Sequence, residues 1–209
     1  MAQGFGAYSD DNEFEIAKYS SSVNISAGFH SGDPLKIKHA LLFAKENNRA
    51  IGANIGYPDI AGFGMRKMEL DKEELEAIVI YQISAITAYA RTLDLEIEHV
   101  RCHGALETAI EEDMGTAAVV INAIKKVSPW LNLFTQKKEV KELSLKNGLK
   151  AALEFEFDAA SSIRQIREKE NEENIKFDTI HFKNVDDIKK AYDIIKPAPV
   201  NYNRVQDQI

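Results

Sequence analysis

Short runs rich in β-forming residues alternate with longer amphipathic stretches along most of the chain. The apolar runs predict strands at residues 22–28, 50–54, 98–104, 130–136 and 150–157. The amphipathic stretches predict helices at residues 34–48, 71–93, 114–127 and 138–148. Strands that alternate with helices imply a parallel sheet with right-handed crossovers. Both a doubly wound sheet and a (β/α) barrel satisfy this pattern.

Residues at the ends of these helices support the assignment. Pro34 suits the first turn of a helix, and Asp33 before it could cap that helix through its carboxylate. Asp71 with Glu74 three residues later forms a capping-box pattern. Gly148 ends the last predicted helix as its stop. A charged run at residues 166–178 is compatible with a helix or with disorder.

Composition limits the class of protein and of partner. The chain has 209 residues, 44% hydrophobic and 28% charged, and a net charge of -7. The length and the ordinary globular composition predict a single domain over residues 1–209. The segment "KPAPVNYNRVQDQI" at residues 196–209 is expected to form a C-terminal tail. The negative charge argues against nucleic acid or an anionic membrane as the main partner. Since the sequence shows neither a signal pattern nor an apolar run of the ~20 residues that span a membrane, we expect a cytoplasmic protein.

Cys102 is the only cysteine, which excludes an intrachain disulfide and a zinc site built from several thiolates. We expect it to be a small buried side chain within the third strand. The sequence also contains no P-loop, so any ATP site would be of another type. The oligomeric state stays open, and a homo-oligomer is compatible with the sequence.

Glycine-punctuated polar segments follow the first three predicted strands, at residues 27–33, 51–68 and 101–107. In parallel α/β folds, ligands bind at the carboxyl ends of the strands, so we expect these segments to meet. His30 and His103 follow the first and third strands and could act as a general acid or base, or as metal ligands. The other histidines, at positions 39, 99 and 181, are expected to be structural.

Other polar residues in these segments have both a functional and a structural interpretation. Asp33 could act in catalysis or only cap the following helix. Asn54 can orient a substrate through its amide but cannot carry a proton as histidine does. Tyr57 and Asp59 in "GYPD" could line a site or only form a turn. Arg66 could bind a carboxylate or phosphate, or lie on the surface.

The segments "SVNISAGFHSGDP", "AIGANIGYPDIAGFGMRKM" and "HVRCHGALE" together resemble the LamB/YcsF family, whose members form the A component of bacterial 5-oxoprolinase. The resemblance covers roughly residues 4–135. It implies an irregular or incomplete (β/α) barrel with a mostly parallel sheet, related to sugar-deacetylase-like barrels. It also implies cleavage of 5-oxo-L-proline to L-glutamate with partner subunits B and C, with ATP as a co-substrate that activates the lactam carbonyl.

The resemblance also suggests roles for individual residues. His30 and His103 match family histidines, Asp33 and Asp59 match family aspartates, and Arg66 matches a basic position. The candidate catalytic residues are therefore His30, Asp33 and His103, with no metal assigned. The candidate substrate-binding residues are Asn24, Asn54, Tyr57, Asp59 and Arg66.

The sequence departs from the family pattern at several positions. The opening strand of the type D-x-N-x-D-x-G-E is not found after Met1, which would leave barrel edges exposed unless something replaces it. Asn54 stands where the family carries a histidine, and Glu107 where it carries a tyrosine. Two alternatives follow: a catalytically impaired binding or scaffold protein of this fold, or a metal-dependent hydrolase in which two histidines and an aspartate hold a divalent ion.

Overall fold

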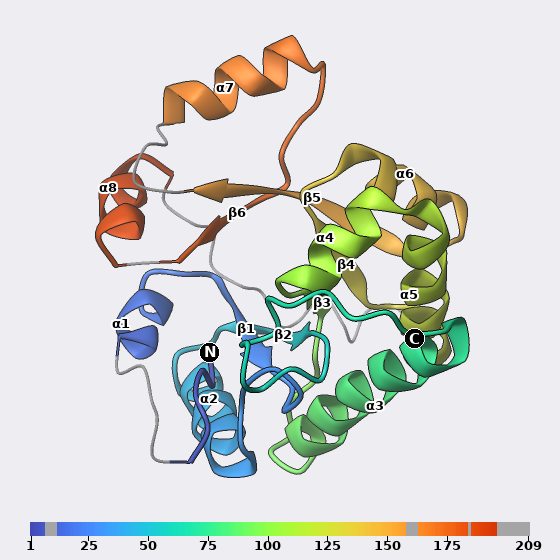
Figure 1. The fold of residues 1–209 in the computed structure, drawn as a ribbon. Coiled ribbons are helices and arrows are strands. Elements are labelled where there is room, and N and C mark those ends of the chain that lie inside the picture. The colour runs from blue at the N-terminus through green and yellow to red at the C-terminus, as the bar shows by residue number, and fades with distance from the viewer. Residues whose placement is uncertain (7–11, 158–162, 184, 196–209) are drawn as a thin grey trace.

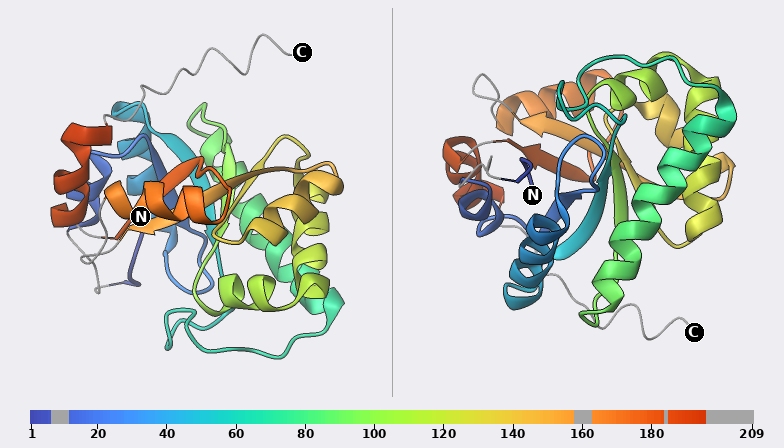
Figure 2. Two further views of the ribbon diagram at one scale, coloured as in Figure 1. Left: turned by 90° about the horizontal axis from the view of Figure 1, so that it is seen from above. Right: turned by 60° about the horizontal axis from the view of Figure 1, so that its bottom comes forward.

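The computed structural model of the chain describes residues 1–6, 12–157, 163–183 and 185–195. A six-stranded sheet forms the centre and curls into a half-barrel (Figures 1 and 2), with strand order β1-β2-β3-β4-β5-β6 and parallel pairing throughout. The strands are β1 (Ser22–Ser26), β2 (Ala50–Ile55), β3 (His99–Cys102), β4 (Asn132–Thr135), β5 (Lys150–Phe157) and β6 (Thr179–Phe182). This confirms the prediction of an incomplete (β/α) barrel.

The four predicted helices are all present, as α2 (Pro34–Glu46), α3 (Lys72–Arg91), α5 (Met114–Val127) and α6 (Lys138–Lys146). They cover the convex face of the sheet (Figure 1). Four further helices were not predicted as such: α1 (Glu13–Ala17), α4 (Ala105–Glu112), α7 (Ile163–Glu172) and α8 (Val185–Ile195). Helix α7 occupies part of the charged run, while the predicted tail at 196–209 lies outside the described residues.

Local capping fixes where the main helices begin. The Asp33 carboxylate accepts hydrogen bonds from the amides of Leu35 and Lys36, at 2.9 and 3.0 Å. Asp71 and Glu74 form the predicted capping box, because each side chain accepts from the backbone amide of the other. Each such cap stabilises its helix by about 1 kcal/mol.

The two faces of the sheet differ in polarity because successive strand residues point to opposite sides. The convex face carries fully buried apolar side chains, which pack under the helices and include Ile25, Ile51, Ile55, Val100 and Leu133. Each contributes roughly 1.5–3 kcal/mol through burial. Cys102 lies in the same core, and burial raises the pKa of its thiol, as expected for an inert buried cysteine.

The N-terminal segment lies against the outer edge of β1. The amide of Ser26 donates to the carbonyl of Met1 at 2.9 Å, and the amide of Gly32 donates to that of Gly4 at 3.0 Å. These bonds cover part of the edge that would otherwise be open for pairing. On the same side of the half-barrel, α1 and α8 lie next to each other (Figure 1), and Nζ of Lys189 lies 5.6 Å from the ring centroid of Tyr19.

None of the helices in the described part of the chain is long and apolar enough to cross a membrane.

Candidate functional site

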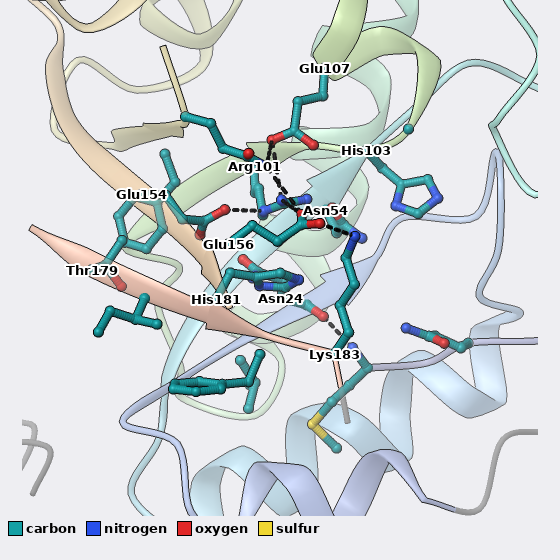
Figure 3. A pocket seen from close by; sticks show the side chains of 18 of the residues that line it. Asn24, Asn54, Arg101, His103, Glu107, Glu154, Glu156, Thr179, His181 and Lys183 are labelled. Carbon is teal, nitrogen blue, oxygen red and sulfur yellow. Dashed lines mark hydrogen bonds and ion pairs between the residues drawn. The ribbon is translucent and has the colours of Figure 1, made fainter. Parts of the chain in front are cut away.

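A polar cavity of about 760 Å³ lies on the concave side of the sheet (Figure 3). The strand register aligns Asn54 of β2 with Arg101 of β3, and Arg101 with Phe134 of β4. It likewise aligns Glu156 of β5 with His181 of β6. All five residues line the cavity. Its volume falls within the roughly 300–1,000 Å³ typical of small-molecule sites.

Arg101 is the buried cation at the centre of this cavity and contacts three glutamates (Figure 3). Its Nε donates to Oε1 of Glu154 at 2.6 Å, and a terminal nitrogen lies 3.1 Å from Glu107 and 3.7 Å from Glu156. Glu156 also forms an ion pair with Lys183. Burial raises the pKa of Glu107 to about 7, although Arg101 opposes that rise. At neutral pH this carboxyl can therefore exchange a proton.

His103 follows β3 and lines the cavity. Its Nε2 lies 2.9 Å from the carbonyl oxygen of Phe63. Because a carbonyl only accepts, Nε2 carries the ring proton and Nδ1 has a free lone pair. Burial lowers the pKa of His103 below its usual range, so the ring is neutral at pH 7. This arrangement suits a general base.

His30 lies behind His103 and outside the set of residues that line the cavity. The two imidazoles stack with ring centroids 4.2 Å apart, and Phe63 meets both edge-on. Burial, with His103 nearby, lowers the pKa of His30 to about 3, so this ring is also neutral. Neither nitrogen of His30 has a hydrogen-bond partner among the described residues. The structure therefore brings the two predicted histidines together but exposes only His103 to the cavity.

Glycines allow the loops to approach these rings closely. A Cβ on Gly56 would lie 2.7 Å from Nδ1 of His30, and one on Gly64 would lie 2.8 Å from the His30 Cβ. Gln82 of α3 fixes Gly56, because its side-chain amide bonds both the N–H and the carbonyl of Gly56 at 3.0 Å. Gly32 adopts φ +92°, and a Cβ there would lie 2.6 Å from the Ser26 carbonyl oxygen. Any side chain at these positions would displace the imidazole or the strand end.

His99, which we expected to be structural, lies on β3 and contacts side chains of β1 and β4. Nε2 of His99 donates to Oδ1 of Asn24 at 2.8 Å, and its ring stacks on Phe134 with centroids 4.2 Å apart. The ring passes so close to Gly52 that a Cβ there would lie 2.1 Å from Nε2. Burial lowers the pKa of His99 to about 3. Asn24, a predicted substrate-binding residue, lines the cavity and is oriented by this contact.

Four other predicted site residues do not reach the cavity. Besides capping α2, Asp33 accepts from the amide of Gly6 at 3.0 Å, so its carboxylate is used locally. Tyr57 is buried. Asp59 and Arg66 bind each other, with 2.9 Å between Nε of Arg66 and Oδ1 of Asp59, and this hydrogen bond lowers the pKa of Asp59 to about 2. Asp59 and Arg66 thus make structural contacts within their own loop, while Asp33 caps α2 and bonds the N-terminal segment.

The metal-site alternative lacks a ligand set in the described ranges 1–6, 12–157, 163–183 and 185–195. No group of three or more histidine, cysteine, aspartate or glutamate side chains in these ranges could hold a metal ion. His30 and His103 face each other ring to ring, and Asp33 is engaged at the start of α2. The arrangement is therefore not that of the proposed two-histidine, one-aspartate site.

The sequence did not predict the main charged residues of the cavity interior, which are Arg101, Glu107, Glu154, Glu156 and Lys183. Most of the predicted site residues follow the strands instead of lying within them. The alternation of polar and apolar residues in "HVRC", "LEFEF" and "TIHF" could have indicated these residues from the sequence. Strands of a parallel sheet are usually apolar on both faces, so this alternation indicates a face that lines a cavity.

The fold and the cavity define an α/β half-barrel protein with a polar binding site on its concave face. The chain belongs to the LamB/YcsF family, which its sequence matches over residues 1–178. A solved relative, described as a lactam utilization protein from Thermus thermophilus, superimposes with a TM-score of 0.80 at 29% identity and covers 91% of each chain. The predicted family and fold are thereby confirmed.

Two curated relatives are named as the A-type subunit of 5-oxoprolinase. The chain is 38% identical to the one from Pyrococcus abyssi over 161 residues, which is 77% of this chain and 63% of the relative. It is 42% identical to the one from Acinetobacter baumannii strain ATCC 17978 over 133 residues, which is 64% of this chain and 52% of the relative. The chain thus spans less than two thirds of the length of either curated relative.

Proposed function

We propose that this chain acts as an A-type subunit of an ATP-dependent 5-oxoprolinase, which opens 5-oxo-L-proline to L-glutamate together with subunits B and C. The names of the relatives support this proposal, as does the family membership. The observation that carries it is the cavity, where the neutral imidazole of His103 lines the same small polar space as Asn54 and the Arg101 cluster. A ring amide with one carboxylate matches this mixture of donors, acceptors and charge.

Opening a cyclic amide requires a base for water, a donor for the developing oxyanion and a proton for the leaving nitrogen. His103 supplies the base through Nδ1. The side-chain NH₂ of Asn54 can donate to the carbonyl oxygen, while the Asn54 oxygen has no hydrogen-bond partner among the described residues. Lys183, whose side chain is 60% exposed, can pair with the substrate carboxylate at the cavity edge. ATP would activate the ring carbonyl before water attacks.

The test is turnover of the chain assembled with partner subunits B and C. We expect ATP hydrolysis that depends on 5-oxo-L-proline, with formation of glutamate. His103→Ala should lower this turnover by about 10²–10⁴-fold, the range for loss of a general base. Glu142→Gln, an exposed change on α6, should leave it unaltered. No stimulation by 5-oxo-L-proline in the native assembly would argue against the proposal.

A second candidate function is binding without turnover. It is favoured by Asn54, whose amide cannot transfer a proton, and by His30, whose ring does not line the cavity. In this case calorimetry would show 5-oxo-L-proline bound to the chain, while the complete assembly would form no glutamate.

The cellular setting belongs to the same proposal. We expect the chain in the cytoplasm, where ATP is available for the reaction. We also expect a single domain, which the family match over residues 1–178 supports. Cell fractionation and limited proteolysis would test these two points.

A further inference from the structure

Three carboxylates share one guanidinium inside the cavity. Glu107, Glu154 and Glu156 all lie within 3.7 Å of a nitrogen of Arg101. The side chain of Arg101 is only 4% exposed and that of Glu107 only 13% exposed. Glu154, at 2% exposed, is more deeply buried still. Interactions between these charges are therefore weakly screened by solvent.

The charges of this cluster do not balance when every group is ionised. Arg101 and Lys183 supply two positive charges against three carboxylates. A third buried anion lacks a partner cation, and binding one proton removes the excess. The cluster therefore favours a state in which one of its three glutamates is protonated.

The contacts assign this proton to Glu107. Burial raises the pKa of Glu154, but its Oε1 receives the short Nε hydrogen bond of Arg101, which favours the ionised form. Glu156 is paired with Lys183. Glu107 makes its contacts with Arg101 and with the Gln136 amide, at 3.1 and 3.3 Å, both through Oε1. Oε2 is thus the oxygen left to carry the proton. The pKa of Glu107, raised to about 7 by burial, agrees with this assignment.

Other titratable groups near the cavity are poorer proton donors. Burial lowers the pKa of His103 and of His181, so both rings are neutral at pH 7, and the Nε2 proton of His103 is engaged by the Phe63 carbonyl. Glu111 of α4 also has a pKa raised by burial, but nearby Lys137 favours its ionised form. Glu107 is the carboxyl that combines burial, a place on the cavity wall and an uncompensated charge.

We propose that Glu107 is the catalytic proton donor of this cavity and protonates the ring nitrogen of a cyclic amide as its carbon–nitrogen bond breaks. This role rests on the proposed function. Water oxygen bonds to the ring carbonyl carbon, and one water proton passes to Nδ1 of His103. The carbon–nitrogen bond then breaks, its electron pair stays on nitrogen, and nitrogen takes the Glu107 proton to leave as an amine. The proton held by His103 finally restores Glu107. The former carbonyl oxygen carries the phosphoryl group from ATP, and a second water releases it as phosphate, so lactam, ATP and two waters give the amino acid, ADP and phosphate.

The first experiment reads the proton directly and needs no turnover. Carbon-13 NMR of side-chain carboxyls in the full chain follows each glutamate through a pH titration. We expect one glutamate that titrates near pH 7 in the native chain and in Glu142→Gln, and that is missing in Glu107→Gln. Absence of such a group, its survival in Glu107→Gln or its loss in Glu111→Gln would overturn the assignment. Circular dichroism of each variant verifies folding.

The second experiment measures the catalytic role in the assembly with subunits B and C. Glu107→Gln should lower kcat by at least about 100-fold and abolish the alkaline limb of its pH profile, as expected for loss of a general acid. Binding of 5-oxo-L-proline should change only a few-fold, because glutamine keeps the Oε1 acceptor. Unchanged kcat in Glu107→Gln would overturn the donor role. The native assembly could lack turnover although the chain contains a glutamate that titrates near pH 7. In that case the proposed function and the donor role both fail, while the NMR result still supports the proton on Glu107.

Discussion

The imidazole of His103 lies on the imidazole of His30, with ring centroids 4.2 Å apart and planes inclined by 13°. Burial lowers the pKa of each ring, and for His30 the neighbouring His103 lowers it further. The pair consequently stays neutral at physiological pH. His103 presents an unprotonated Nδ1, and His30 holds the ring of His103 in place from behind.

The buried histidines make stability depend on pH. His30 has a native pKa of about 3 against 6.5 when unfolded, so the unfolded chain binds more protons between these values. The free energy of unfolding should therefore fall as pH is lowered from 6.5 toward 3. His30→Phe should reduce this slope by up to about 1.4 kcal/mol per pH unit. Urea denaturation at a series of pH values measures it, with the exposed change His39→Phe as the matched control.

Arg101 should be essential for stability because it neutralises buried Glu154. Arg101→Met should cost about 3–5 kcal/mol in the free energy of unfolding, since it leaves a buried charge without a partner. The double change with Glu154→Met should recover most of that loss. Arg91→Met, which breaks an exposed pair with Glu96, should cost less than about 1 kcal/mol. Equal losses for Arg91 and Arg101 in chemical denaturation would contradict this expectation.

The ring of His99 packs so closely on the backbone at position 52 that only glycine fits there. Gly52→Ala should cost about 1–3 kcal/mol of stability, because its Cβ would lie 2.1 Å from Nε2 and force the ring to move. In a double-mutant cycle with His99→Ala, the cost of Gly52→Ala should nearly vanish. Additive losses in thermal unfolding would show that the two positions do not interact.

Lys183 should matter for ligand binding more than for folding. Lys183→Ala should weaken the binding of 5-oxo-L-proline by about 10–100-fold, which corresponds to about 1.4–3 kcal/mol for a hydrogen bond to a charged group. Calorimetry with the folded chain measures this change. Lys146→Ala, at the exposed end of α6, provides the matched control and should bind normally. Normal binding by Lys183→Ala would remove the proposed contact with the substrate carboxylate.

Features controlled by neighbouring residues were predicted correctly from the sequence. Asp33 and Asp71 cap their helices because the amides they bind lie two or three residues further along the chain. Helices α4 and α8 were not anticipated. Helix α4 has only eight residues, and its N-cap is Gly104, which has no side chain to cap the helix, so the local sequence carries no start signal. Asp33 matches a family aspartate and was therefore a candidate catalytic residue, but its carboxylate caps α2. A motif match alone thus did not establish a catalytic role.

The sequence by itself determined the order of the first five strands and the four main helices, the caps of α2 and α3, and the family, because these depend on periodicity and on residues close along the chain. Tertiary structure decided which side chains form the site. Arg101 meets Glu154, 53 residues later in the chain, because the curled parallel sheet brings β3 and β5 to one concave face. His103 meets His30 because the carboxyl ends of β1 and β3 lie at the same edge of the sheet. Electrostatic energy inside that face depends on burial and on distances between strands, which no local pattern specifies.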